Sequence, residues 1–163
     1  MRDVYGAALI TGASSGIGLE LARLFARDRW ELVLVARRAD ALEALAGELR
    51  PVSGQPVHVI VSDLARLNAA AELVENLQQR GIQIDALVNN AGTAVFGPFV
   101  NADWELHRQT IQLNVTCLTE LSRGLLPGMI ERRRGWILNV ASTAAFQPGP
   151  LLAVYFATKA YIL

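Results

Sequence analysis

Residues 11–18 read TGASSGIG, a run with three glycines that joins a short apolar segment to a helical one. The preceding segment, Tyr5–Thr11, is apolar and typical of a buried strand. In the following segment, Gly16–Arg29, apolar residues recur at the spacing of one helix face. A glycine-rich turn between a strand and a helix predicts the first half of a βαβ unit.

The glycines of this turn, Gly12, Gly16 and Gly18, have separate expected tasks. Gly12 permits the tight turn, Gly16 lets a phosphate approach the backbone, and Gly18 lets the helix pack closely on the strand. The helix N-terminus offers free N–H groups and a positive dipole end to a pyrophosphate. The spacing is G-x-x-x-G-x-G, and an ordinary tight turn is the alternative. The position between strand and helix favours a nucleotide site.

The rest of the chain repeats the alternation of strand and helix. The other strand-like runs are Glu31–Ala36, Val57–Val61, Ile84–Val88 and Gly135–Val140. The expected helices are Asp40–Arg50 stopped by Pro51, Arg66–Arg80, one long helix from Ala102 to about Arg133 bent near Pro127, and one from Tyr155 onward. This pattern predicts an α/β fold, a Rossmann-like doubly wound parallel sheet in the order 3-2-1-4-5. We expect residues 1–163 to form a single dinucleotide-binding domain.

Composition narrows the class of protein. The 163 residues are 52% hydrophobic and 18% charged, which is typical of a globular chain. Fifteen basic residues balance fifteen acidic ones, so neither a nucleic-acid nor a membrane partner is indicated. No run has the pattern of a signal peptide or the length of a membrane span. The one cysteine, Cys117, excludes an internal disulfide and a metal site built from several cysteines, and it fits a cytoplasmic location.

Arg37 and Arg38 follow the second strand, where the residue type predicts which nucleotide binds. An acidic side chain at this place holds the ribose hydroxyls of NAD, whereas an arginine accommodates the 2′-phosphate of NADP. No carboxylate is present there, so we expect NADP(H) rather than NAD(H), with Arg37 as the main contact. Two solvated arginines without a ligand are the alternative.

Tyr155 and Lys159 lie four residues apart in the run VYFATKA, which places them on one face of a helix. An ammonium group near a phenol favours the ionised phenol and makes it a usable acid or base near neutral pH. Such a pair is common by chance. Ser142, however, supplies a hydroxyl just after the fifth strand, at the edge where open α/β sheets place their ligands.

Together these motifs resemble the short-chain dehydrogenase/reductase family. The resemblance runs over the whole chain and keeps the family's order. In chain order, the matching motifs are the glycine loop, Asp63 after the third strand, Asn89–Gly92 (NNAG) after the fourth, Asn114, Ser142 and the Tyr155–Lys159 pair. The resemblance implies an NADP(H)-dependent oxidoreductase that interconverts a carbonyl and a secondary alcohol.

The resemblance implies cofactor contacts along four segments. Asp63 and Leu64 would bound the adenine, and Arg37 with Arg38 would read the 2′-phosphate. The loop around the pyrophosphate would comprise Gly12, Ser14, Ser15, Gly16, Ile17 and Gly18. The segment along the ribose would comprise Asn90, Ala91 and Gly92.

The resemblance also implies the catalytic roles. Tyr155 would exchange a proton with the substrate oxygen, and Lys159 would hold the nicotinamide ribose. Ser142 would orient the substrate oxygen. Asn114 would anchor a water that relays protons from Lys159.

The chain departs from the family's pattern in three places. Ser15 stands where many NADP-preferring relatives carry a basic residue, and Thr158 replaces the usual serine before the lysine. Family members continue with further strands and helices, so we expect this chain to be the C-terminally incomplete part of a longer enzyme. A non-catalytic dinucleotide-binding protein and a folding fragment are the alternatives. Relatives often use the long helix and the Tyr155 helix as a subunit interface, so we expect a homo-oligomer.

Overall fold

The computed structural model describes residues 6–163, so Tyr5 of the expected first strand lies outside the described part. Five parallel strands form one sheet in the order β3-β2-β1-β4-β5, which confirms the predicted α/β architecture. The strands are β1 (Ala7–Thr11), β2 (Glu31–Ala36), β3 (Val57–Val61), β4 (Ile84–Asn89) and β5 (Trp136–Asn139).

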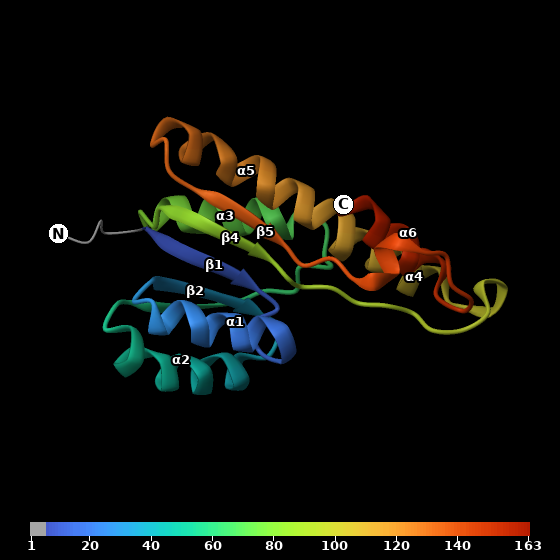
Figure 1. The fold of residues 1–163 in the computed structure, drawn as a ribbon, viewed down its shortest axis with the longest axis horizontal. Helices are drawn as coiled ribbons and strands as arrows, with labels where there is room; N and C mark the ends of the chain where they lie inside the picture. Colours follow the sequence, from blue (N-terminus) through green and yellow to red (C-terminus); the bar gives the residue numbers. More distant parts are fainter. Residues whose placement is uncertain (1–5) are drawn as a thin grey trace.

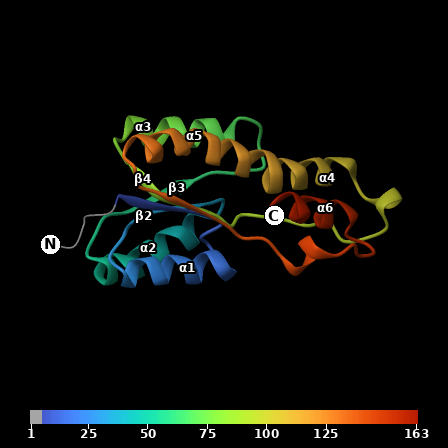
Figure 2. The same ribbon diagram turned by 45° about the horizontal axis from the view of Figure 1, so that its top comes forward.

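Helices cover both faces of the sheet (Figures 1 and 2). Helices α1 (Gly16–Arg27) and α2 (Ala39–Ser53) lie on one face, and α3 (Ala69–Gln79) and α5 (Leu118–Glu131) lie on the other. Successive strand residues point to opposite faces, so β1 and β2 serve both cores. The two clusters of buried side chains divide accordingly: Ile10 and Leu34 belong to the first, and Leu9 and Val33 to the second.

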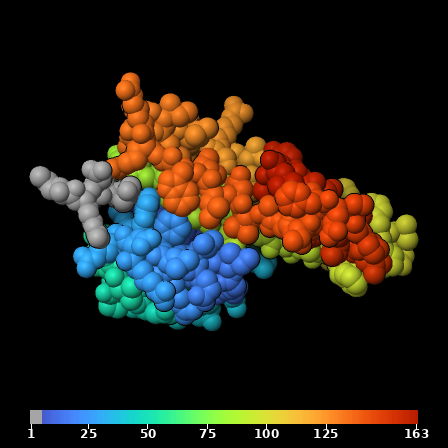
Figure 3. Space-filling view, viewed as in Figure 1, coloured from blue at the N-terminus to red at the C-terminus, as the bar shows by residue number. Residues whose placement is uncertain are grey.

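The elements that follow β4 and β5 extend beyond the carboxyl ends of the strands. They are η1 (Phe99–Asn101), α4 (Trp104–Ile111), η3 (Thr143–Phe146) and α6 (Ala153–Tyr161). Figure 3 shows them as a narrower projection beside the body of the molecule. Helix α6 packs against η3 and α4, and the N–H of Gly97 donates to the Leu151 carbonyl at 2.8 Å. The Tyr155 helix therefore stands at the edge where ligands bind.

The expected long helix is interrupted at a different place from the one predicted. Helices α4 and α5 are joined by a π-helical segment, Gln112–Cys117, and Pro127 lies within α5. Single π-helical turns inside α-helices are frequent at functional sites. Here the segment contains Asn114, whose buried side chain forms hydrogen bonds with two other parts of the chain. Helical periodicity in the sequence does not reveal such tertiary hydrogen bonds.

Two helix boundaries lie three residues away from their predicted positions. Helix α2 continues through Pro51 to Ser53, whose buried hydroxyl donates to the Trp30 carbonyl at 2.6 Å, and Gly54 ends it in a left-handed conformation (φ +64°). Pro51 has no backbone N–H and so costs the last turn of α2 one hydrogen bond. The Ser53 hydrogen bond and the Gly54 cap offset this loss. Helix α3 begins at Ala69 rather than near residue 66, because Asn68 adopts φ +63°.

A buried carboxylate closes the amino end of the sheet, opposite the candidate site. Asp85 in β4 is 1% exposed and accepts from the N–H of Gly6 at 2.6 Å. Arg132 and Arg134 pair with its two oxygens at 3.1 and 2.6 Å. A buried carboxylate is tolerated when it is paired in this way, so the arginines after α5 serve the fold. Among the described residues, no helix combines the length and apolar character that crossing a membrane requires.

Candidate functional site

The glycine loop and the NNAG segment are held together by hydrogen bonds from Thr11 and Asn90. The Thr11 hydroxyl accepts from the N–H groups of Asn90 and Ala91, both at 3.0 Å. The Asn90 amide donates back to the Thr11 carbonyl at 2.8 Å. Gly18 packs directly beneath: a Cβ there would stand 2.5 Å from the Gly12 carbonyl oxygen and 2.4 Å from the Asn90 amide nitrogen. Only glycine fits this contact.

The start of α1 is open to an anion. Ser15 precedes the helix without a capping hydrogen bond from its side chain, so the first N–H groups remain available. Gly16 adopts φ +57°, and a Cβ on it would meet nothing within 4 Å. The backbone at this point is therefore accessible, as a pyrophosphate contact requires.

A cleft of about 610 Å³ opens in front of the loop, which is within the usual size of small-molecule sites. It lies at the carboxyl ends of the strands, between the glycine loop and the segment after β4. The structure brings eleven of the predicted cofactor residues to its wall: Gly12, Ser14, Ser15, Ile17, Arg37, Arg38, Asp63, Leu64, Asn90, Ala91 and Gly92. Gly16 and Gly18 are not among the lining residues.

Six residues that the sequence did not predict as cofactor contacts also line the cleft: Ala36, Ser62, Ala65, Thr93, Gln109 and Leu113. Ala36, Ser62 and Ala65 flank the ends of β2 and β3, where any parallel sheet presents residues to a ligand. Gln109 and Leu113 are four residues apart on the helix leading to Asn114, a spacing that would have placed them on one face.

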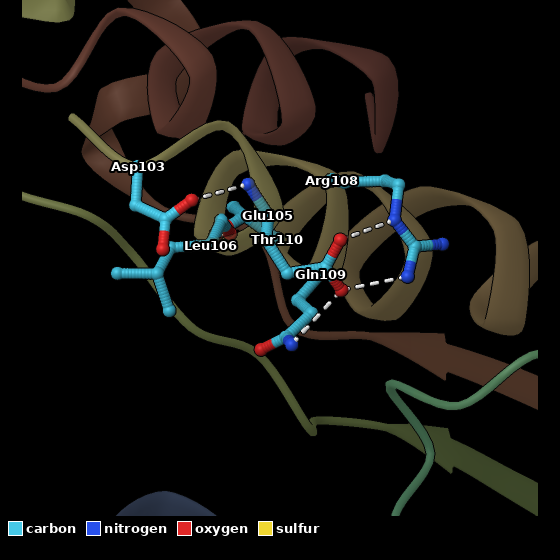
Figure 4. A network of polar contacts seen from close by, with 6 residues as sticks. All are labelled: Asp103, Glu105, Leu106, Arg108, Gln109 and Thr110. Atoms are coloured by element: carbon cyan, nitrogen blue, oxygen red, sulfur yellow. Dashed lines mark hydrogen bonds and ion pairs between the residues drawn. The ribbon is translucent and has the colours of Figure 1, made fainter.

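Figure 4 shows how Gln109 is held on α4. Its amide donates to Glu105 at 3.2 Å, and the same carboxylate takes two hydrogen bonds from Arg108, at 2.7 and 2.8 Å. The Arg108 guanidinium, together with Gln109, lowers the pKa of Glu105 below its usual range. Asp103 caps the helix by accepting from the N–H of Glu105 at 2.9 Å. Gln109 therefore borders the cleft beside an exposed charged cluster at the start of α4.

The two arginines after β2 differ in their surroundings. Arg38 donates to the carbonyl oxygen of Ser14 at 2.9 Å and lies 3.3 Å from its hydroxyl, which draws the guanidinium against the glycine loop. Arg37 is an exposed side chain on the cleft wall. Both therefore border the cleft, but the loop itself positions Arg38.

Lys159 is a buried cation beside Tyr155. Its side chain is 6% exposed, and Nζ donates to the Val140 carbonyl just after β5 at 2.8 Å. Nζ lies 5.9 Å from the centroid of the Tyr155 ring. Burial lowers the pKa of Lys159 below the ordinary lysine value, because desolvation disfavours the charged form.

Asn114 and Ser142 use their side chains to bond neighbouring segments. The Asn114 oxygen accepts from the N–H of Thr93, and its nitrogen donates to the Thr93 carbonyl, both at 2.9 Å. The same nitrogen donates to the Thr158 hydroxyl at 3.0 Å. Ser142 caps η3, and its oxygen accepts from the N–H of Ala144 at 3.1 Å.

Gly92 connects the cleft with these residues. It lines the cleft, and a Cβ on it would lie 3.3 Å from the Asn114 oxygen and 3.7 Å from Lys159 Nζ. Lys159 and Asn114 therefore lie next to the cleft at Gly92, although neither side chain lines it. Ser142 and Tyr155 are half-buried on η3 and α6, which pack together, and neither lines the cleft.

The residues present fit a dinucleotide. The open helix N-terminus and the glycine cradle suit a pyrophosphate. The cations Arg37 and Arg38 at one side of the cleft suit a further phosphate. At the other end, the buried Lys159 ammonium suits ribose hydroxyls.

Comparison with known proteins agrees with this geometry. A family model described as short chain dehydrogenase matches residues 6–163. A fatty acyl-CoA reductase of Mycobacterium tuberculosis is 39% identical over 155 residues, which cover 93% of this chain and 52% of that protein. An NADP-dependent 3-hydroxy acid dehydrogenase of Salmonella typhi is 37% identical, over 94% of this chain and 61% of that protein.

Solved structures agree as well. A short-chain dehydrogenase from Sphingobium yanoikuyae in complex with NADPH superposes with a TM-score of 0.89 at 41% identity, covering 96% of this chain and 61% of the other. The chain thus spans about half to three fifths of the length of these relatives. Because the family match extends over nearly every residue, the chain belongs to the short-chain dehydrogenase family.

Proposed function

We propose that the protein is an NADP(H)-dependent oxidoreductase that interconverts a carbonyl and a secondary alcohol. The observation that carries this proposal is the position of Gly92. It joins a dinucleotide-sized cleft to the buried Lys159, one helical turn from Tyr155. The relatives named above are a reductase and dehydrogenases, which supports the same chemistry.

In this proposal the residues of the chain bind, orient and move a proton. When bound, NADPH supplies the hydride. Tyr155 gives its phenolic proton to the developing alkoxide, and the Lys159 ammonium beside it favours the resulting phenolate. Ser142 already accepts a hydrogen bond from Ala144, so its own proton remains available to donate to the substrate oxygen.

The existing hydrogen bonds of Asn114 limit what its side chain can do in a proton relay. Both hydrogens of its side-chain nitrogen are engaged, one by the Thr93 carbonyl and one by the Thr158 hydroxyl. The side chain is therefore limited to accepting a further hydrogen bond through its oxygen. A water bound to the Asn114 oxygen would donate a hydrogen bond to that oxygen. The same water would receive a proton relayed from the Lys159 ammonium group.

For the cofactor, we infer that Arg38 is the better positioned of the two arginines. Replacing it (Arg38→Gln) is expected to weaken NADPH binding about 10- to 100-fold, since a charge-assisted hydrogen bond contributes about 1.5–3 kcal/mol. NADH lacks the 2′-phosphate, so its affinity should stay nearly constant. Fluorescence titration of the purified variant with both nucleotides measures this.

Two further variants sharpen the cofactor experiment. Arg37→Gln tests the arginine that the sequence favoured, and a larger loss there than in Arg38→Gln would reverse the assignment. Arg80→Gln removes an exposed arginine just after α3 that does not line the cleft, so it should bind both nucleotides as the wild type does. Equal losses for NADPH and NADH in Arg38→Gln would contradict a 2′-phosphate contact.

The reaction itself is tested by turnover of NADPH with a panel of aldehydes and ketones. Nucleotide binding together with carbonyl-dependent oxidation of NADPH would support the proposal. Tight binding with no turnover on any member would favour a nucleotide-binding protein without catalysis. Because Ser142 and Tyr155 stand outside the described cleft, that second outcome is the main competitor.

We also propose a homo-oligomer. Trp104 and Ile111 lie seven residues apart on one face of α4, and both are exposed. Exposed apolar side chains that share a helix face are typical of a subunit contact. Multi-angle light scattering on the purified protein is expected to give a multiple of the chain mass. A strictly monomeric particle would contradict the proposal.

A further inference from the structure

Thr158 lies between Tyr155 and Lys159 on α6 and is as buried as the lysine, with 3% of its surface exposed. Its hydroxyl donates to the Tyr155 carbonyl at 2.8 Å and accepts from the Asn114 amide at 3.0 Å. A hydroxyl carries one proton, and an amide nitrogen only donates, so the direction of both bonds is fixed. The Thr158 side chain therefore has one orientation that satisfies both partners.

Asn114 is a rigid partner for this bond. Its oxygen accepts from the N–H of Thr93 and its nitrogen donates to the Thr93 carbonyl, and Thr93 lines the cleft. The remaining N–H of the side chain donates to the Thr158 hydroxyl. The side chain is 1% exposed, so any other orientation would leave buried polar groups unpaired. One carboxamide thus joins three segments: the cleft wall after β4, the π-helical segment and α6.

A second side-chain hydrogen bond between α6 and the long helix is of a different kind. The Tyr161 hydroxyl bonds the Thr119 hydroxyl at 2.8 Å in an exposed position at the end of α6. Water competes with an exposed bond of this type, so it constrains α6 weakly. The buried bond between Thr158 and Asn114 lies instead in the turn that carries both reactive side chains.

We propose that Thr158 is a positioning residue, whose hydrogen bond to Asn114 fixes the rotation of α6 and so sets where Tyr155 and Lys159 stand at the Gly92 end of the cleft. This inference rests on the proposed oxidoreductase function. Thr158 itself need not touch substrate or cofactor. Thr158 acts on the reaction only through the positions that it gives to Tyr155 and Lys159.

The first test compares variants at this position in turnover. Thr158→Val removes the hydroxyl at nearly constant size, and kcat is expected to fall about 10- to 100-fold, the effect of a misplacement on the order of 1 Å. KM for NADPH should change much less, because most of the expected cofactor contacts lie on the glycine loop and after β2, β3 and β4, and α6 carries none of these. Thr158→Ser keeps the hydroxyl and should restore kcat. Thr158→Ala serves where valine prevents folding.

The second test does not need turnover. Hydrogen exchange of the α6 amides and of the segment around Thr93 should accelerate in Thr158→Val and return to wild-type rates in Thr158→Ser. Thr110→Val is the matched control. It removes an equally buried hydroxyl that bonds only the Leu106 carbonyl of its own helix, so α6 exchange and turnover should stay unchanged.

The outcomes separate this inference from the proposed function. A wild-type protein without turnover overturns the function, and the exchange rates then decide whether Thr158 orders α6. Unchanged α6 exchange in Thr158→Val overturns the inference even if the enzyme is active. A kcat within about twofold of wild type, or a failure of serine to restore it, does the same.

Discussion

Phenylalanine at position 155 should lower kcat by on the order of 10²- to 10⁴-fold, the usual contribution of a positioned acid or base. Tyr155→Phe keeps the ring, which stands 5.9 Å from Lys159 Nζ, and removes only the group that exchanges the proton. NADPH affinity should stay within about threefold of wild type, because binding and proton transfer use different atoms. Single-turnover measurements with NADPH and a carbonyl substrate, beside a fluorescence titration, report both quantities.

Tyr161→Phe is the matched control for this experiment. It makes the same change on the same helix, but the Tyr161 hydroxyl bonds Thr119 at the surface, away from Lys159. Loss of that bond should cost about 0.5–1.5 kcal/mol of stability at most and leave turnover intact. Residual activity of Tyr155→Phe comparable to that of Tyr161→Phe would remove Tyr155 from the mechanism.

Alanine at position 18 should destabilise the fold and impair nucleotide binding together. The added Cβ would stand 2.5 Å from the Gly12 carbonyl oxygen and 2.4 Å from the Asn90 amide nitrogen, so the loop or the NNAG segment must move. Overpacking of this kind costs about 1–3 kcal/mol. The displaced groups also shape the cleft, so NADPH affinity should fall with the free energy of unfolding. Denaturant unfolding and nucleotide titration measure the two effects.

Gly47→Ala is the matched control, and it should act in the opposite direction. Gly47 lies in the interior of α2, and a Cβ there would meet nothing within 4 Å. The same substitution should therefore stabilise the protein by about 0.5–1 kcal/mol, because alanine loses less backbone entropy in a helix. If both variants shifted stability in the same direction, the close contact at Gly18 would not be the cause.

Much of the cleft was predictable because its residues sit in local motifs. The glycine loop is recognisable from its position between a strand and a helix, and Arg37 and Arg38 from the end of β2. Residues such as Gln109 were missed because a helix reaches the cleft only after the chain has crossed the sheet. Helical spacing is enough to place Gln109 and Leu113 on one face, but it does not show the cavity which that face borders.

The same distinction holds for the catalytic group. The sequence by itself determined the alternation of strands and helices and the pairing of Tyr155 with Lys159 on one helical face. These depend on periodicity and on turn chemistry between near neighbours. The tertiary structure alone decided that Lys159 Nζ meets the Val140 carbonyl, that the long helix takes a π-helical turn, and that Asn114 grips Thr93 and Thr158. Buried polar groups must find partners wherever packing brings donors and acceptors together, and those partners here lie between 19 and 44 residues apart in the chain.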